Sequence, residues 1–205
     1  VSDRSGNYEE MVKKGLRVIV RLNHAYPPGG TLPHSARYDE FARNCANFVK
    51  ASKGCHIWVI GNEMNHSDER PPGEVITPAL YAECFRKCRR AIRELEGHEH
   101  DQVVIGGVAP WNPSTSASPE YRTGPEGDWV DYFREILLRL KGQCDGIAIH
   151  TYAHGNDRKV ITSEEKMQSF PDRYYNFYAY RDFMNAIPQE MRDLPVYITE
   201  TNPHR

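Results

Sequence analysis

The sequence has no apolar run that approaches the ~20 residues of a membrane-spanning helix, and no charged segment followed by an apolar one stands at its start. It also lacks an excess of either charge, because 26 Lys and Arg stand against 28 Asp and Glu, for a formal charge of −2. We therefore expect neither a membrane nor a nucleic acid as partner. The first residue is Val1 rather than Met, so the lack of a leader leaves the cellular location open.

Cysteine is scarce and irregularly spaced. The five cysteines are an odd number, and their positions match neither a disulfide framework nor a zinc ribbon. Cys84 and Cys88 lie one helical turn apart, so half of a metal site is conceivable there. The favoured interpretation is that both are small apolar residues on the buried face of a helix.

Five segments have the composition of β-strands. They are short, rich in Val and Ile, and almost continuously apolar rather than alternating, which is typical of strands buried on both faces of a parallel sheet. The predicted strands are residues 16–22, 57–61, 103–109, 146–152 and 195–201.

Segments with helical periodicity separate these strands. Thr77 before Pro78 is an expected helix N-cap, and Asp128 is another. Corresponding points in successive strands are about 40 to 50 residues apart, the spacing of repeated strand–helix units. The predicted fold class is therefore α/β with a parallel sheet. The predicted helices are residues 36–51, 77–95, 128–142 and 174–187.

The loops on the two sides of the predicted sheet differ in length. Loops that lead from a helix into a strand are short, such as residues 52–55, whereas those that leave a strand are long, such as residues 64–76 and 153–171. In α/β folds the loops at the carboxyl ends of the strands build the functional site. We expect polar residues at those strand ends to face that site.

Two carboxylates end apolar strands: Glu63 in "HIWVIGNEMNH" and Glu200 in "VYITETN". Parallel strands deliver both side chains to the same end of the sheet. Two carboxyl groups facing each other across a cleft are what cleavage of a glycosidic bond requires, one to donate a proton and one to attack or to activate water. An ion pair or a loop cap is the plainer alternative for each residue.

Three motifs in this order, "IGNEMN", "IAIHTYAHG" and "VYITETN", resemble the retaining glycoside hydrolases of the (β/α)8-barrel clan with glutamates on the fourth and seventh strands. The resemblance covers residues from about 16 to 202 and indicates no family within the clan. It implies a TIM barrel of which this chain holds five strands, the third to the seventh. We expect one catalytic barrel domain over residues 1–205, incomplete at both ends, with the remainder of the barrel supplied by missing chain segments or by association.

The resemblance also implies roles for individual residues. Glu63 matches the acid/base, Glu200 the nucleophile, and Asn62 the residue that binds the hydroxyl beside the anomeric carbon. His150 and Tyr152 match a His-x-Tyr pair whose tyrosine supports the nucleophile. A hydrogen bond from Tyr152 and a nearby cation would keep Glu200 ionised, while a negative neighbour would help Glu63 to hold its proton.

The match is looser at the first strand, where the chain reads Arg21, Leu22, Asn23, His24. Arg21 is a candidate for the cation near Glu200, and His24 is a candidate sugar contact, with binding to backbone or solvent as the alternative for both. Trp111 follows a strand and could stack on a sugar or simply pack beneath a long loop.

The leading hypothesis is a retaining glycosidase that acts on a β-linked oligosaccharide or glycoside and uses no metal or cofactor. A second hypothesis is an inactive carbohydrate-binding barrel that keeps Trp111 and the cleft. A third, the weakest, is a metal-dependent hydrolase that uses Glu63, His24, His150 and His154.

Overall fold

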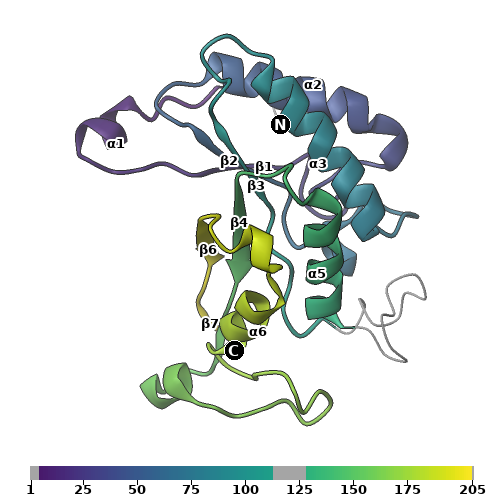
Figure 1. Ribbon diagram of the computed structural model, residues 1–205, viewed down its shortest axis with the longest axis vertical. Coiled ribbons are helices and arrows are strands. Elements are labelled where there is room, and N and C mark those ends of the chain that lie inside the picture. Colours follow the sequence, from purple (N-terminus) through teal and green to yellow (C-terminus); the bar gives the residue numbers. More distant parts are fainter. Residues whose placement is uncertain (1–4, 113–127, 205) are drawn as a thin grey trace.

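The structure is a computed structural model that describes residues 5–112 and 128–204. Within these residues no helix is long and apolar enough to cross a membrane. The described chain forms one five-stranded parallel sheet that curls into half of a barrel, with helices along its outer side (Figure 1). The predicted α/β class and the partial TIM barrel are confirmed.

The strands follow one another across the sheet in chain order, each parallel to the next. This order is what repeated strand–helix units produce, because each helix crosses back over the same face of the sheet. The strands are β1 (Val20–Leu22), β2 (Ile57–Ile60), β3 (Gln102–Ile105), β4 (Gly146–His150) and β6 (Val196–Glu200). A second, two-stranded sheet pairs β5 (Ala153–His154) with β7 (Pro203–His204).

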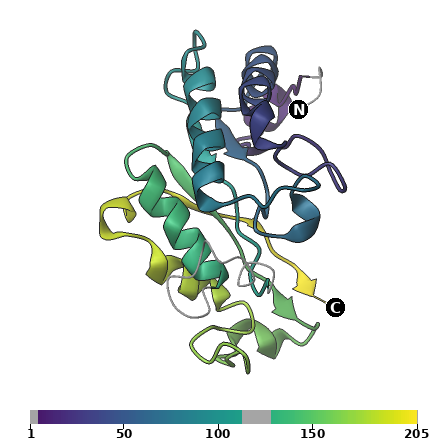
Figure 2. The same ribbon diagram turned by 90° about the vertical axis from the view of Figure 1, so that its right-hand side faces the viewer.

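Helices cover the outer face of the sheet, and neighbouring helices pack against each other in chain order (Figure 2). The predicted caps are confirmed: Thr77 accepts a hydrogen bond from the backbone N–H of Leu80 at 2.9 Å, and Asp128 caps the helix that follows it. The α-helices are α1 (Glu9–Lys13), α2 (Tyr38–Ala51), α3 (Pro78–Arg93), α5 (Trp129–Leu140) and α6 (Ala179–Ala186). Short 3-10 turns are η1 (Ser35–Arg37), η2 (Ser67–Glu69), η4 (Arg158–Thr162) and η5 (Gln189–Met191).

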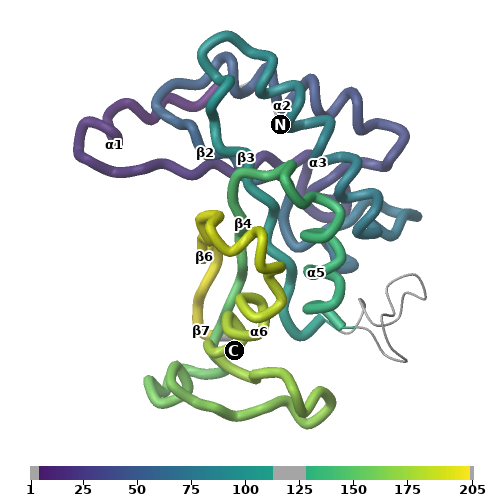
Figure 3. The backbone as a smooth tube through the Cα atoms, in the orientation of Figure 1, coloured from purple at the N-terminus to yellow at the C-terminus, as the bar shows by residue number. Residues whose placement is uncertain are grey.

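The last predicted helix is shorter than expected. Residues 174–178 were included in it, but the backbone of Tyr174 pairs with Lys166 instead, and its N–H donates to the carboxylate of Asp182 at 2.8 Å. These bonds hold the segment against the long loop that leaves β4, so α6 begins only at Ala179. Figure 3 shows this connection between β5 and α6 as a wide excursion near the C-terminus.

The sheet has two apolar faces of unequal size. Outward side chains of β2 such as Trp58 and Ile60 belong to the main core between sheet and helices, which also contains Phe133 of α5. On the inner, concave face a small cluster of Ile57, Val59, Val104 and Ala148 packs against Tyr197. Cys84 and Cys88 are fully buried in the main core, as the interpretation as small apolar residues predicted.

Each outermost strand of the five-stranded sheet pairs on one side only among the described residues. Apolar side chains at these edges are exposed, with Ile19 before β1 at 38% and Ile198 in β6 at 47%. An open edge of this kind is a surface on which further strands can pair.

Candidate active site

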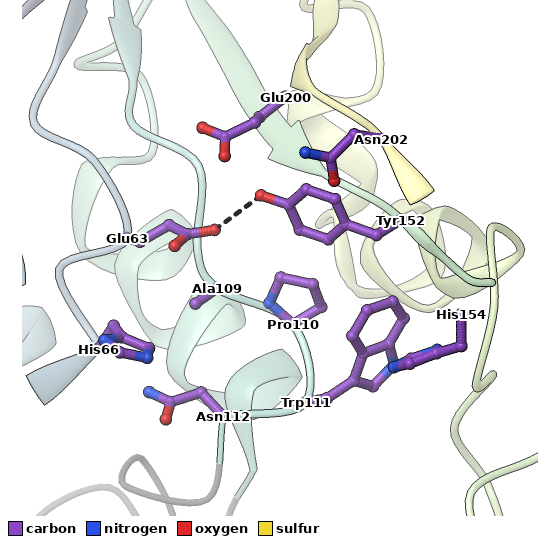
Figure 4. Close-up of a pocket in the computed structure, with 10 residues that line it drawn as sticks. All are labelled: Glu63, His66, Ala109, Pro110, Trp111, Asn112, Tyr152, His154, Glu200 and Asn202. Atoms are coloured by element: carbon purple, nitrogen blue, oxygen red, sulfur yellow. Dashed lines mark hydrogen bonds between the residues drawn. The ribbon is translucent and has the colours of Figure 1, made fainter. Parts of the chain in front are cut away.

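The carboxyl ends of the strands surround a pocket of about 400 Å³. Figure 4 shows Glu63 and Glu200 on the same side of it, with Trp111 and His154 on the opposite wall. The long loops that leave β2, β3 and β4 supply most of the lining, as the unequal loop lengths predicted. The residues that line the pocket are Glu63, His66, Ala109, Pro110, Trp111, Asn112, Tyr152, His154, Glu200 and Asn202.

A sharp turn at the end of β2 places Glu63 in this pocket. Gly61 has a φ of 73° and Glu63 itself has a φ of 39°, which is uncommon for a residue with a side chain. The N–H of Glu63 donates to the carbonyl of Gly107 at 2.8 Å, which fixes the turn against the end of β3. Strained backbone of this kind is often found at functional sites, where the surrounding structure maintains it.

His150 and Tyr152 both reach Glu63 from the end of β4. The Nδ1 of His150 lies 2.8 Å from Oε1 of Glu63, and the hydroxyl of Tyr152 donates to the same oxygen at 3.0 Å. On its other side, Nε2 of His150 lies 3.1 Å from the hydroxyl of Thr199. His150 is completely buried and Tyr152 almost so, so both donors are held in place by packing.

Packing around His150 depends on Gly107. A Cβ at position 107 would lie 2.4 Å from Cδ2 of the imidazole and 2.5 Å from its Nε2, which no real contact allows. The glycine therefore leaves room for the ring that binds Glu63.

Glu200 extends from the end of β6 into the same pocket. The guanidinium of Arg21 donates to Oε2 of Glu200 at 3.2 Å, and the Glu200 side chain is 40% exposed. Donor atoms of Glu63, His150 and Glu200 lie within 4.8 Å of one another. The two carboxylates that end the strands thus converge in one pocket.

Arg21 also links Glu200 to Asn62. Its guanidinium donates to the side-chain oxygen of Asn62. The residue Asn62 is only 5% exposed. The backbone carbonyl of Asn62 accepts a 2.7 Å hydrogen bond from the hydroxyl of Thr31. The structure therefore places Arg21 beside Glu200. This is one of the two alternatives from the sequence, the other being that Arg21 binds backbone or solvent.

Tyr152 and Glu63 show two features that bear on the sequence-based expectations. The hydroxyl of Tyr152 donates to Oε1 of Glu63, and it also interacts with the carboxylate of Glu200, the residue that it was expected to support. Burial alone would raise the pKa of Glu63, but the hydrogen bonds from His150 and Tyr152 outweigh it and hold that pKa below its ordinary value. This direction is opposite to the raised pKa that a proton donor at Glu63 was expected to have, and the assignment of Glu63 as proton donor stays a prediction. Burial, followed by the charges of Glu63 and Glu200, raises the pKa of Tyr152, so its hydroxyl remains a donor.

Trp111 forms the far wall of the pocket together with other rings. Its indole N–H donates to the carbonyl of Tyr174 at 2.9 Å, and its φ is 57°. The imidazole of His154 lies 4.5 Å from the indole between ring centroids and stacks flat on Tyr175 at 3.8 Å. The indole of Trp111 thus lines the pocket while its N–H is bound to the backbone of Tyr174.

His24 lies away from this pocket. Its ring packs edge-on against Phe41 with centroids 6.2 Å apart, and its backbone N–H donates to the carbonyl of Thr31. Burial, followed by the charge of Arg37, lowers the pKa of His24. His24 lines a different pocket together with Arg21, so its predicted contact with a sugar in the adjacent subsite stays a prediction.

Sequence reasoning did not single out Glu69, a third carboxylate near the pair. Burial is the main reason why the pKa of Glu69 is raised, and the negative charge of Glu63 raises it further. Its Oε2 is buried and has no hydrogen-bond partner among the residues that the structure describes. The sequence does not predict this position, because Glu69 lies in a polar loop, seven residues after Asn62, that has no periodic pattern.

Asn65 is a second residue that the sequence did not reveal. Its side chain accepts from the N–H of Ala109 at 2.8 Å and donates to the carbonyl of the same residue at 3.0 Å. The side chain of Asn112 in turn donates to the carbonyl of Asn65. These bonds fix the loop that carries Trp111, so Asn65 positions the aromatic wall.

Glu63, His150 and Glu200 are the residues at this pocket that could also hold a metal ion. His24 and His154, the other two members of the expected metal set, do not belong to this group of donors. In the structure, His150, Tyr152 and Arg21 already supply hydrogen-bond partners to the two carboxylates.

Comparison with known proteins gives one informative result. No family model and no curated protein matches the chain. Among solved structures it is similar to AbfB, a family 51 α-L-arabinofuranosidase from Bifidobacterium longum, with a TM-score of 0.52 and 19% identity. The match covers 95% of this chain and 36% of that one, so the chain spans about a third of that enzyme's length. At this identity the likeness shows the fold alone.

Proposed function

We propose that the protein is a retaining glycoside hydrolase that cleaves β-glycosidic bonds by double displacement. The observation that carries the proposal is the approach of Glu63 and Glu200, whose carboxylate oxygens lie within 4.8 Å across one pocket. Retaining enzymes hold their two carboxyl groups ~5 to 5.5 Å apart, whereas inverting enzymes need roughly 6.5 to 9.5 Å to admit a water molecule. The half-barrel that the chain shares with a glycosidase is consistent with this proposal.

In the proposed first step, a carboxylate oxygen of Glu200 attacks the anomeric carbon while Glu63 gives its proton to the departing glycosidic oxygen. Arg21 donates to the carboxylate of Glu200 and orients it for this attack. In the second step, Glu63 takes a proton from water as that water attacks the anomeric carbon and releases the sugar from Glu200. The first step needs Glu63 protonated, so its lowered pKa favours turnover at acid pH.

Substrate contacts in this proposal come from the lining of the pocket and from Asn62 beside it. Asn62 lies beside Arg21 and Glu200, where it could bind the hydroxyl next to the anomeric carbon. The indole of Trp111, opposite the two carboxylates, offers an apolar face on which a sugar ring can stack (Figure 4).

A panel of aryl glycosides tests the proposal on the full-length protein. It should include aryl β-glycosides, and an aryl α-L-arabinofuranoside because the structural neighbour is named for that activity. Glu200→Gln should abolish turnover of every substrate that the parent cleaves. Glu63→Gln should cost about 10²- to 10⁴-fold with a poor leaving group and much less with an activated phenol, which needs little protonation.

Glu164→Gln is a matched control, since this glutamate is 76% exposed and lies outside the pocket. It should leave turnover unchanged. Full activity of either pocket variant would contradict the proposal, and oligosaccharide binding without hydrolysis by the parent would favour an inactive carbohydrate-binding barrel.

A metal-dependent hydrolase is the second candidate, because donor atoms of Glu63, His150 and Glu200 lie close enough to share an ion. Loss of activity after chelation and its recovery with zinc would favour that candidate. A retaining glycosidase as proposed here should be insensitive to both treatments.

A further inference from the structure

Two imidazoles and a carboxylate meet at the end of the sheet opposite the pocket. His56 directly precedes β2, and Asp101 directly precedes β3, while His98 lies in the short connection between α3 and β3. The N–H of Gln102 donates to the carbonyl of His56 at 2.9 Å, so the two strand starts are already joined by backbone. Nothing in the proposed hydrolysis uses these residues.

The side chains of His56 and His98 converge on the carboxylate of Asp101. Nδ1 of His56 lies 2.6 Å from its Oδ1, and Nδ1 of His98 lies 2.7 Å from its Oδ2. Donor atoms of all three residues lie within 4.8 Å of one another. One small volume is therefore faced by two imidazole nitrogens and a carboxylate.

Burial and a further hydrogen bond hold the carboxylate in place. Asp101 is 3% exposed, and the indole N–H of Trp58 donates to its Oδ2 at 2.6 Å. His98 is mostly buried, with 14% of its side chain exposed, whereas the ring of His56 is 67% exposed. The cluster is thus rigid on its inner side and open to solvent on the other.

We propose that His56, His98 and Asp101 bind one divalent transition-metal ion of the zinc class. Two neutral imidazoles and one carboxylate are a ligand set that suits Zn²⁺, with water from the open side as a fourth ligand. Metal–ligand bonds of ~2.0 to 2.1 Å place tetrahedral donors roughly 3.3 Å apart. The ring of His56 is exposed and can adjust its position to this spacing. The Trp58 N–H supplies the outer hydrogen bond that orients a ligating carboxylate.

The ion would have a structural role. It would tie the starts of β2 and β3 to the connection that follows α3, at the end of the barrel where residues serve stability rather than chemistry. Zinc should therefore raise the unfolding temperature without being required for turnover.

Calorimetric titration of the metal-free, full-length protein with Zn²⁺ tests the proposal. One ion per chain should bind, and His98→Gln and His56→Gln should each weaken binding at least about tenfold. The rise in unfolding temperature with zinc should be lost in the same variants. His56→Gln changes an exposed side chain, so it remains informative if His98→Gln does not fold.

Two controls separate this site from other donors. His100→Gln alters the neighbouring histidine, which lies outside the cluster, and should leave binding unchanged. Glu63→Gln removes a donor from the pocket and should also leave it unchanged. No saturable zinc binding would overturn the proposal, and so would binding that survives both histidine variants but is lost in Glu63→Gln.

Discussion

Replacement of Tyr152 by Phe tests how the site controls the proton on Glu63. The change removes only the hydroxyl that donates to Oε1 of Glu63 at 3.0 Å and leaves the ring in its packing. Hydrogen bonds to charged groups contribute ~1.5 to 3 kcal/mol. The Glu63 side chain is 16% exposed, so solvent screens this bond little, but His150 continues to donate to the same oxygen. We therefore take the lower limit, about 1.5 kcal/mol, which corresponds to roughly one pKa unit.

The sign follows from the direction of the existing shift. The hydroxyl stabilises the ionised form of Glu63, so its loss raises the pKa of that carboxyl toward its ordinary value. If Glu63 is the proton donor, activity falls as pH rises through its pKa. The basic limb of the kcat/KM profile, which reports groups in the free protein, should therefore move about one unit to higher pH.

The assay is the pH dependence of kcat/KM for the parent, Tyr152→Phe and Tyr175→Phe. Tyr175 is a matched control because its ring stacks on His154 and it does not line the pocket. An unchanged basic limb in Tyr152→Phe, or movement of the acid limb alone, would refute the reasoning. Movement of the acid limb would mean that the hydroxyl supports Glu200 in the working protein.

Three further predictions concern the fold that holds the site. Burial alone would raise the pKa of Asp145, but Arg89 and the N–H of Val103 outweigh it and lower that pKa. Asp145→Asn should reduce the free energy of unfolding by about 2 kcal/mol at pH 7, because these side chains are only partly buried. In chemical denaturation, the difference in unfolding free energy between the variant and the parent should shrink as pH falls through the pKa of Asp145, which lies below the ordinary 3.8. A difference that persists at that pH would contradict the role of the Asp145 charge. Gly107→Ala should displace His150 and lower kcat by about 10²-fold or more. Gly73→Ala strains the backbone, because Gly73 has a φ of 81°, but it meets nothing near its Cβ and lies outside the pocket, so kcat should stay unchanged. Equal kcat values for the two variants would contradict the packing argument. Residues 1–205 produced alone should self-associate in sedimentation experiments through the open edges of β1 and β6, and cooperative unfolding of a stable monomer would count against this expectation.

Much of the fold could be predicted because its signals are local. Continuous apolar strands such as β2 indicate burial on both faces, and Thr77 before Pro78 marks a helix start whatever the tertiary contacts are. The convergence of Glu63 and Glu200 also followed from local sequence, since parallel strands in register bring their carboxyl ends together.

The remaining details depend on contacts between segments far apart in the chain. The hydrogen bond of Tyr152 to Glu63 depends on positions to within an ångström, and the periodicity of the sequence does not predict these. The last predicted helix starts at Ala179 rather than at residue 174 because Tyr174 pairs with Lys166 in a long loop. His56 joins the cluster with His98 and Asp101 only because the starts of β2 and β3 are neighbours. The sequence "HEHD" at residues 98–101 already brought two of the three possible metal ligands together.

The most direct test of the proposed double displacement is azide rescue of two variants, with the configuration of the product determined by NMR. In Glu200→Ala, azide should replace the missing nucleophile and give a glycosyl azide of inverted configuration. In Glu63→Ala, azide should attack the glycosyl intermediate on Glu200 and give the retained configuration. Exchange of these two outcomes would reverse the roles of the residues, and the absence of any glycosyl azide from an otherwise active protein would contradict the mechanism.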